Sequence, residues 1–169
     1  MTAGGRVAWR EDMFLRPQHF QQQDRFLEAL VNARLNSLAS YPWGVTELVI
    51  DENLAALGKF GVVRCVGVMP DGTSFSFPDQ LPLPAPIDMP VDTRDAIVSL
   101  TLPAQQIGAV EFQDSEGAAA EIRFLVDEAE VADSFSGDRM REPIEVGRPN
   151  IRLGVTRDQT YGRVCIGLV

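Results

Sequence analysis

The chain has 169 residues, of which 45% are hydrophobic and 23% are charged, and its formal net charge is -9. This length suits one domain with its own core, and the composition is that of a globular protein, neither disordered nor fibrous. The negative charge argues against nucleic-acid binding, and no apolar run approaches the roughly 20 residues of a membrane-spanning helix. The N-terminus also lacks the apolar centre of a signal peptide, so we expect a cytoplasmic protein.

The first 17 residues form an arm in front of a predicted helix. Four large apolar side chains lie between Trp9 and Leu15, and the only histidine, His19, follows directly together with a run of glutamines. Aromatic side chains are common anchors of protein interfaces, so the arm suits docking onto a partner. The alternative is that the arm covers the open end of the domain's own sheets, and the residues alone do not decide between the two.

A helix is predicted from about Gln18 to Ala39. Pro17 suits the first helical position, because its missing N–H would be unpaired there in any case. Proline and glycine near residue 42 end the segment. Apolar residues recur at helical spacing, and we expect this stripe to be buried against the rest of the domain: Phe20, Leu27, Leu30, Val31, Leu35 and Leu38.

From residue 45 onward the sequence changes to short β-branched runs separated by turns, which is typical of a sandwich or barrel. A short turn or single helical turn is expected at 51–57. Strands are expected at 45–50, 59–69, 73–77, 96–102, 119–126, 144–146, 151–156 and 161–169.

Glycine and proline add detail to this pattern. Within the strand at 59–69, Gly61 and Gly67 mark a bulge or a close approach by another backbone. Pro70-Asp71-Gly72 gives the clearest hairpin signal. Five prolines between residues 78 and 90 predict an extended, polyproline-like edge segment. Because the chain stops inside an apolar run at 165–169, we expect it to be the N-terminal part of a longer protein.

Residues suited to catalysis or metal binding are sparse. A lone histidine such as His19 beside an apolar run is more often structural than catalytic, and with Cys65 and Cys165 it does not make a zinc site. We expect both cysteines to be buried thiols rather than a disulfide. Residues 111–145 hold eleven acidic and three basic residues without EF-hand spacing, which we interpret as a solvated acidic surface. No catalytic residue, cofactor, metal or enzymatic activity is therefore predicted.

The opening pattern resembles a known family. The match runs Val7-x-Trp9-x-Glu11-x-Met13-Phe14-Leu15-x-Pro17-Gln18-His19-Phe20-Gln21 and is similar to the start of TssK, the baseplate protein of the bacterial type VI secretion system. Agreement continues at Trp43-Gly44, at Leu57-Gly58-Lys59-Phe60, between Gly67 and Phe75, and at Arg148-Pro149-Asn150-Ile151-Arg152-Leu153. The resemblance thus spans most of the chain and is weakest at residues 104–145.

This resemblance implies a mainly β fold: a β-sandwich shoulder, like that of phage receptor-binding proteins, with one N-terminal α-helix. The chain would divide into an arm at 1–17 and a helix-plus-sandwich domain at 18–169. In the full-length protein the resemblance implies a homotrimer that docks onto the baseplate wedge proteins TssF and TssG. It also implies contact with the membrane-complex proteins TssL and TssM through a C-terminal region that this chain lacks.

The resemblance implies no enzymatic activity, no cofactor and no direct membrane insertion. It does not say which motif residues contact the wedge and which pack the core. The residues carried over as candidates for partner binding are Trp9, Glu11, Phe14, Leu15, Pro17, Gln18, His19 and Phe20.

A carbohydrate-binding sandwich is the alternative function, because phage receptor-binding architecture offers an analogy, although a fold alone does not confer function. Such a site would need exposed aromatic platforms, for which Tyr41, Trp43 and Tyr161 are the candidates. Because Trp43 lies between Pro42 and Gly44, we expect it to be a packed corner instead.

Overall fold

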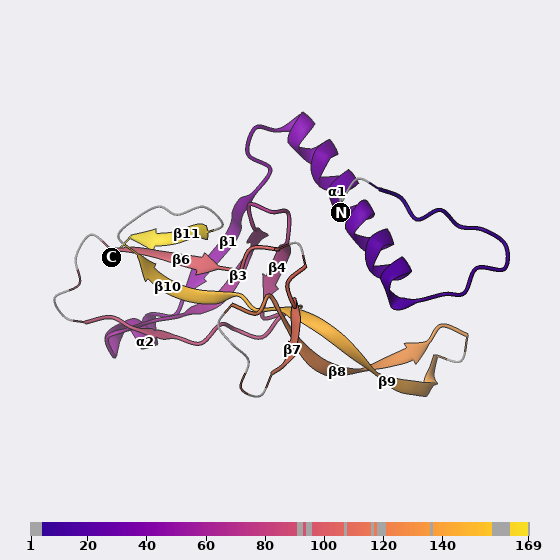
Figure 1. Cartoon of the computed structure of the whole chain (residues 1–169). Helices are drawn as coiled ribbons and strands as arrows, with labels where there is room; N and C mark the ends of the chain where they lie inside the picture. Colours follow the sequence, from indigo (N-terminus) through magenta and orange to yellow (C-terminus); the bar gives the residue numbers. More distant parts are fainter. Residues whose placement is uncertain are drawn as a thin grey trace.

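A computed structural model of the chain describes residues 5–90, 93, 96–106, 108–115, 117, 121–135, 137–156 and 163–168. It confirms a mainly β fold with one long N-terminal helix (Figure 1). In chain order the elements are α1 (Pro17–Leu38), β1 (Gly44–Ile50), α2 (Glu52–Ala56), β2 (Lys59–Phe60), β3 (Val62–Val68), β4 (Ser74–Phe77), β5 (Ile87–Asp88), β6 (Ile97–Thr101), β7 (Phe112–Asp114), β8 (Phe124–Asp133), β9 (Gly137–Pro149), β10 (Arg152–Thr156) and β11 (Arg163–Leu168).

Two three-stranded antiparallel sheets, β1-β3-β4 and β10-β6-β11, contribute to one apolar core. Val98 and Leu100 of β6 are fully buried, and Leu102 lies on the same face, as their alternation predicts. The core residues are Phe60, Val62, Cys65, Met69, Phe75, Phe77, Val98, Leu100, Leu102, Ile151 and Leu153. Cys65 is a free thiol, and burial raises its pKa to about 11.

The predicted hairpin at Pro70-Asp71-Gly72 is confirmed, because β3 and β4 pair antiparallel across this turn with Cys65 opposite Phe77. The predicted strand at 59–69 is instead divided at Gly61 into β2 and β3. A Cβ atom on Gly67 would collide with the carbonyl oxygen of Gly44 on the neighbouring strand. The predicted close approach by another backbone is therefore present at Gly67.

The helix prediction was right in position and wrong in packing. α1 begins at Pro17, after an extended Arg16, and ends at Leu38, within one residue of the predicted bounds. No residue of α1 is buried, although its apolar stripe was expected to pack against the domain. Figure 1 shows why the stripe is not buried: α1 lies beside the sheets and does not pack across them. Periodicity shows that a helix has an apolar face but does not show what covers that face.

A long antiparallel hairpin, β8–β9, was largely missed. The strand expected at 119–126 begins only at Phe124 and continues to Asp133, through the acidic stretch that was interpreted as plain surface. Its first predicted residues, 119 and 120, lie outside the described residues, as does the expected turn at 157–159. Figure 1 shows the hairpin projecting away from the two core sheets. Its backbone groups pair from Phe124 opposite Pro149 to Asp133 opposite Gly137, and β7 pairs with β8 at the base of the hairpin.

Candidate interaction surface

The arm in front of α1 folds back along the helix. Gln22 donates a hydrogen bond of 2.7 Å from Nε2 to the carbonyl oxygen of Gly5, and the Arg6 guanidinium lies 5.1 Å from the centre of the Phe26 ring. Between these contacts and Pro17 the chain reverses at Asp12, which has a positive φ of 60°. Aspartate tolerates this left-handed conformation better than most residues. The arm is therefore a loop held at both ends by the helix it precedes (Figure 1).

His19 stabilises the first turn of the helix. The backbone N–H of Arg16 donates a hydrogen bond of 3.0 Å to Nδ1 of His19, while the N–H of His19 donates to the carbonyl oxygen of Arg16, also at 3.0 Å. Because Nδ1 accepts, the neutral imidazole carries its proton on Nε2. This reciprocal pair fixes the entry of the arm into the helix, much as a capping box does. The structural interpretation of His19 is thus supported by its contacts.

Trp9 packs onto the same turn. Its ring centre lies 6.2 Å from that of His19 and 6.4 Å from that of Phe20, with tilted planes in both cases. These distances are those of favourable aromatic pairs. The structure therefore brings three of the motif residues into one cluster at the start of α1.

The remaining motif residues are exposed, some in the loop and some in the first turn of α1. Phe14, which lies between the turn at Asp12 and the start of α1, is 81% exposed, and Leu15 beside it is also exposed. Of the eight motif residues only His19 is half-buried, and the other seven are exposed. We call this set the arm surface; it comprises Trp9, Glu11, Phe14, Leu15, Pro17, Gln18, His19 and Phe20. None of these side chains enters the buried core, so the arm does not close the end of the sandwich.

The helix is joined to the sheets by a polar cluster that the sequence did not reveal. Asn32 donates a hydrogen bond of 2.9 Å to the carbonyl oxygen of Asp71 in the β3–β4 turn. The buried Arg123 holds this turn in place: its guanidinium donates to Asp71 Oδ2 at 2.7 Å, to Thr73 Oγ1 at 2.8 Å and to the carbonyl oxygen of Pro103 at 2.6 Å. Sequence reasoning could identify the turn but not the side chains that converge on it.

The cluster shifts two carboxyl groups in opposite directions. Burial disfavours the charged form of Asp71, yet hydrogen bonds from the Thr73 backbone and from Arg123 outweigh it and lower its pKa. Burial raises the pKa of Glu28 on α1, with Asp24 and other nearby carboxylates adding to the rise and Arg123 opposing it. Burial of Glu28 therefore opposes the attachment of α1, whereas the hydrogen bond from Asn32 supports it.

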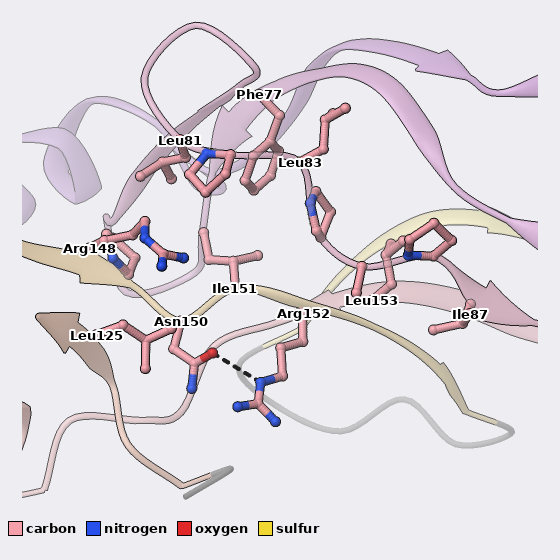
Figure 2. A pocket seen from close by; sticks show the side chains of 15 residues that line it. Phe77, Leu81, Leu83, Ile87, Leu125, Arg148, Asn150, Ile151, Arg152 and Leu153 are labelled. Atoms are coloured by element: carbon pink, nitrogen blue, oxygen red, sulfur yellow. Dashed lines mark hydrogen bonds between the residues drawn. The ribbon is translucent and has the colours of Figure 1, made fainter. Parts of the chain in front are cut away.

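A hollow of about 390 Å³ lies on another part of the molecule, between the proline-rich segment and the β9–β10 connection (Figure 2). Its polar side chains are already engaged: Asn150 Oδ1 accepts a hydrogen bond of 2.9 Å from Arg152 Nε, and Arg148 pairs with Asp127. The residues that line it include no histidine, cysteine, serine or carboxylate. It therefore lacks the paired nucleophile and base of a hydrolytic site.

Of the three aromatic residues considered for carbohydrate binding, the structure describes Tyr41 and Trp43, and these two do not stack into a flat platform. Trp43 is exposed, contrary to the packed corner expected from its neighbours, because Tyr41 and Trp43 precede β1, which begins at Gly44, and neither belongs to the core. The two rings meet edge to face, with centres 6.1 Å apart. Tyr161 lies outside the described residues. The carbohydrate-binding alternative is not favoured.

Comparison with known proteins identifies the family. Residues 19–169 match the bacterial type VI secretion family that includes EvfL, ImpJ and VasE, and the chain therefore belongs to this family. The chain is 41% identical over 168 residues to the type VI secretion system baseplate component TssK1 of Pseudomonas aeruginosa. That match covers 99% of this chain and 38% of the relative, so the chain spans well under half of the relative's length.

Solved structures agree with this assignment. A crystal structure of TssK superposes with a TM-score of 0.82 at 31% identity, covering 97% of this chain and 37% of that one. A cryo-electron microscopy structure of a TssK-TssF-TssG baseplate subcomplex also gives a TM-score of 0.82, at 24% identity, covering 98% of this chain and 55% of the matched chain. The resemblance to TssK seen in the sequence is thus confirmed. Among the described residues, α1 and α2 both fall short of the apolar length needed to cross a lipid bilayer.

Proposed function

We propose that this chain is the part of a type VI secretion baseplate protein that docks onto the wedge proteins TssF and TssG, and that the arm surface is the site of contact. The family assignment and the baseplate relative support a structural, non-enzymatic role. The choice of wedge proteins is supported by the fold shared with a chain from a TssK-TssF-TssG subcomplex.

The exposure of Phe14 is the main observation that supports the arm surface as the contact site. A phenylalanine that is 81% exposed, on a loop anchored at both ends, is preorganised for a partner and loses little conformational freedom on binding. Burying Phe14 or Trp9 would contribute roughly 1.5 to 3 kcal/mol each from apolar area alone. Glu11 and Gln18 beside them supply polar groups for a rim around these anchors.

The contacts within the chain support different roles for the arm and for the rest of the domain. We propose that residues 1–17 act as the interaction arm and that residues 18–169 act as its mount, with the first turn of the mount completing the arm surface. Within the arm surface, Phe14, Leu15 and Trp9 face the partner, whereas His19 holds the geometry of the first helical turn. For the whole protein we further propose the homotrimer, and a location on the cytoplasmic side of the inner membrane.

Co-purification tests this function. The tagged 169-residue chain is co-expressed with TssF and TssG from the same bacterium, as the intact sequence and as Phe14→Ala and Trp9→Ala. Leu57→Ala is the matched control, because Leu57 is 74% exposed after α2 and outside the arm surface. We expect the intact chain and the control to retain both wedge proteins and the two arm variants to lose most of them. Failure of the intact chain to retain either wedge protein would refute the proposal.

A further inference from the structure

One face of the projecting β8–β9 hairpin is apolar and exposed. Val131 of β8 lies directly opposite Glu142 of β9, and directly opposed residues share a face. Met140 and Ile144 lie two positions to either side of Glu142, so they fall on that face as well. The three apolar side chains are 46 to 56% exposed. We call this the hairpin patch; it comprises Val131, Met140, Glu142 and Ile144.

The opposite face of the hairpin is charged. Glu128 lies directly opposite Glu145, Glu130 follows two positions along β8, and all three are exposed. Such a separation of apolar and charged faces is typical of an antiparallel pair that packs on one side and meets water on the other. A two-stranded hairpin is only marginally stable in water by itself, and packing against a helix stabilises it. The hairpin patch therefore has the character of a covered face.

The C-terminal half of α1 carries a second exposed apolar surface. Its large apolar residues recur at four- and three-residue steps, which places them on one side of the helix, and they are 41 to 82% exposed. Glu28 and Asn32 face the polar cluster at the β3–β4 turn instead. Arg34 falls among the apolar residues. We call this the helix patch; it comprises Leu27, Val31, Arg34, Leu35 and Leu38.

The two patches match in charge and in length. Arg34 is the one charged member of the helix patch and Glu142 that of the hairpin patch, and neither forms an ion pair with another residue that the structure describes. The helix patch is about 16 Å long at the rise of an α-helix, and the hairpin patch is about 14 Å long at the rise of a strand. Figure 1 shows the outer end of the hairpin apart from α1, so the two patches of one chain do not cover each other.

We propose that the hairpin patch of one copy of this chain packs onto the helix patch of the next copy, with Glu142 beside Arg34. A contact between two different patches uses each patch once on every copy and generates a ring when the rotation closes. This inference rests on the homotrimer proposed above and specifies its contact, which is repeated three times around the ring. The neighbour's helix supplies the layer that the hairpin lacks. Neither patch includes a residue of the arm surface, so each copy keeps its wedge contact.

Charge exchange tests this contact in the 169-residue chain, by sedimentation velocity over a range of concentrations. We expect a monomer–trimer equilibrium for the unaltered chain. Arg34→Glu and Glu142→Arg should each weaken the association about tenfold or more, because like charges then meet at every contact. The double variant Arg34→Glu/Glu142→Arg should regain the trimer, since opposite charges meet again. Glu130→Arg, on the opposite face of the same hairpin, is the matched control and should leave association unchanged.

Photo-crosslinking locates the contact. A photoreactive phenylalanine analogue replaces Met140 in one protein and Glu130 in a control, and mixing with isotope-labelled chain identifies crosslinks between copies by mass spectrometry. We expect the analogue at position 140 to crosslink to α1 of another copy and the analogue at position 130 not to do so. Circular dichroism establishes that every variant is folded.

The outcomes separate this contact from the proposals on which it rests. A trimer whose crosslinks from position 140 fall outside α1, or a double variant that does not recover, would overturn the contact and leave the homotrimer standing. A chain that stays monomeric at all concentrations, or that stops at a dimer, would overturn the contact together with a trimer built by this domain. Retention of TssF and TssG is measured separately, so wedge docking can hold or fail independently.

Discussion

Asn32 of α1 donates its hydrogen bond to the carbonyl oxygen of Asp71 directly above Gly72, where a Cβ atom would collide with the Asn32 side chain. Gly72 also has a φ of 91°, which side chains rarely adopt. Glycine is therefore required at position 72 for two reasons: the hairpin turn needs its positive φ, and the Asn32 side chain of α1 leaves no room for a Cβ atom. This attachment leaves the arm surface and several large apolar side chains of α1 exposed.

Removing the centre of the polar cluster should destabilise the protein. Arg123→Ala leaves the Asp71 carboxylate, the Thr73 hydroxyl and the Pro103 carbonyl without their donor. We expect a loss of about 2 to 3 kcal/mol in the free energy of unfolding, below the 3 to 5 of a fully buried pair because Asp71 is 41% exposed. Urea unfolding followed by circular dichroism measures it.

Arg64→Ala is the control for this change, because Arg64 pairs with Glu47 and Asp79 at the surface. Exposed pairs contribute little, so this variant should unfold close to the unaltered chain. Equal losses in the two variants would contradict the central role of Arg123.

Asp71 should make stability depend on pH on the acid side. Its pKa in the folded protein lies below the ordinary value of 3.8, so its contribution is complete above that value and is lost as the pH falls through the folded pKa. The unaltered chain should exceed Asp71→Asn in unfolding free energy near neutral pH, and the difference should shrink below about pH 4. Urea midpoints of both proteins across this range measure the effect, and a constant difference would contradict it.

Glu28 should make stability depend on pH in the opposite direction from Asp71. Its pKa is raised above 4.5, so the folded state favours the protonated form and is destabilised as the group ionises with rising pH. Glu28→Gln should therefore unfold at a higher urea concentration near neutral pH, and the gain should vanish in acid. Glu130→Gln on the exposed face of β8 is the control. A less stable Glu28→Gln at neutral pH would show that attraction to Arg123 dominates instead.

The elements that sequence reasoning predicted well are those with local causes. Pro17 and the apolar periodicity located α1, and Pro70-Asp71-Gly72 located the β3–β4 hairpin. Both signals act within a few residues of the structure they specify. The motif likewise identified the family before any fold was known.

The parts that were missed depend on distant residues. The burial of Arg123 arises from Asp71, Thr73 and Pro103, which lie 20 or more positions away in the sequence. The β8–β9 hairpin pairs residues up to 25 positions apart, and the second half of β8 is exposed and acidic, so no alternation of large apolar residues predicted a strand there. The exposure of the helix stripe depends on where the helix is attached, which periodicity does not encode.

Photo-crosslinking tests the central proposal, docking through the arm surface, most directly. A photoreactive phenylalanine analogue replaces Phe14 in one protein and Leu57 in another, and each is irradiated with purified TssF–TssG complex. The account predicts a crosslink to TssF or TssG from the analogue at position 14 and none from that at position 57. Binding of the complex with no crosslink from position 14, or with a crosslink from position 57 alone, would contradict it.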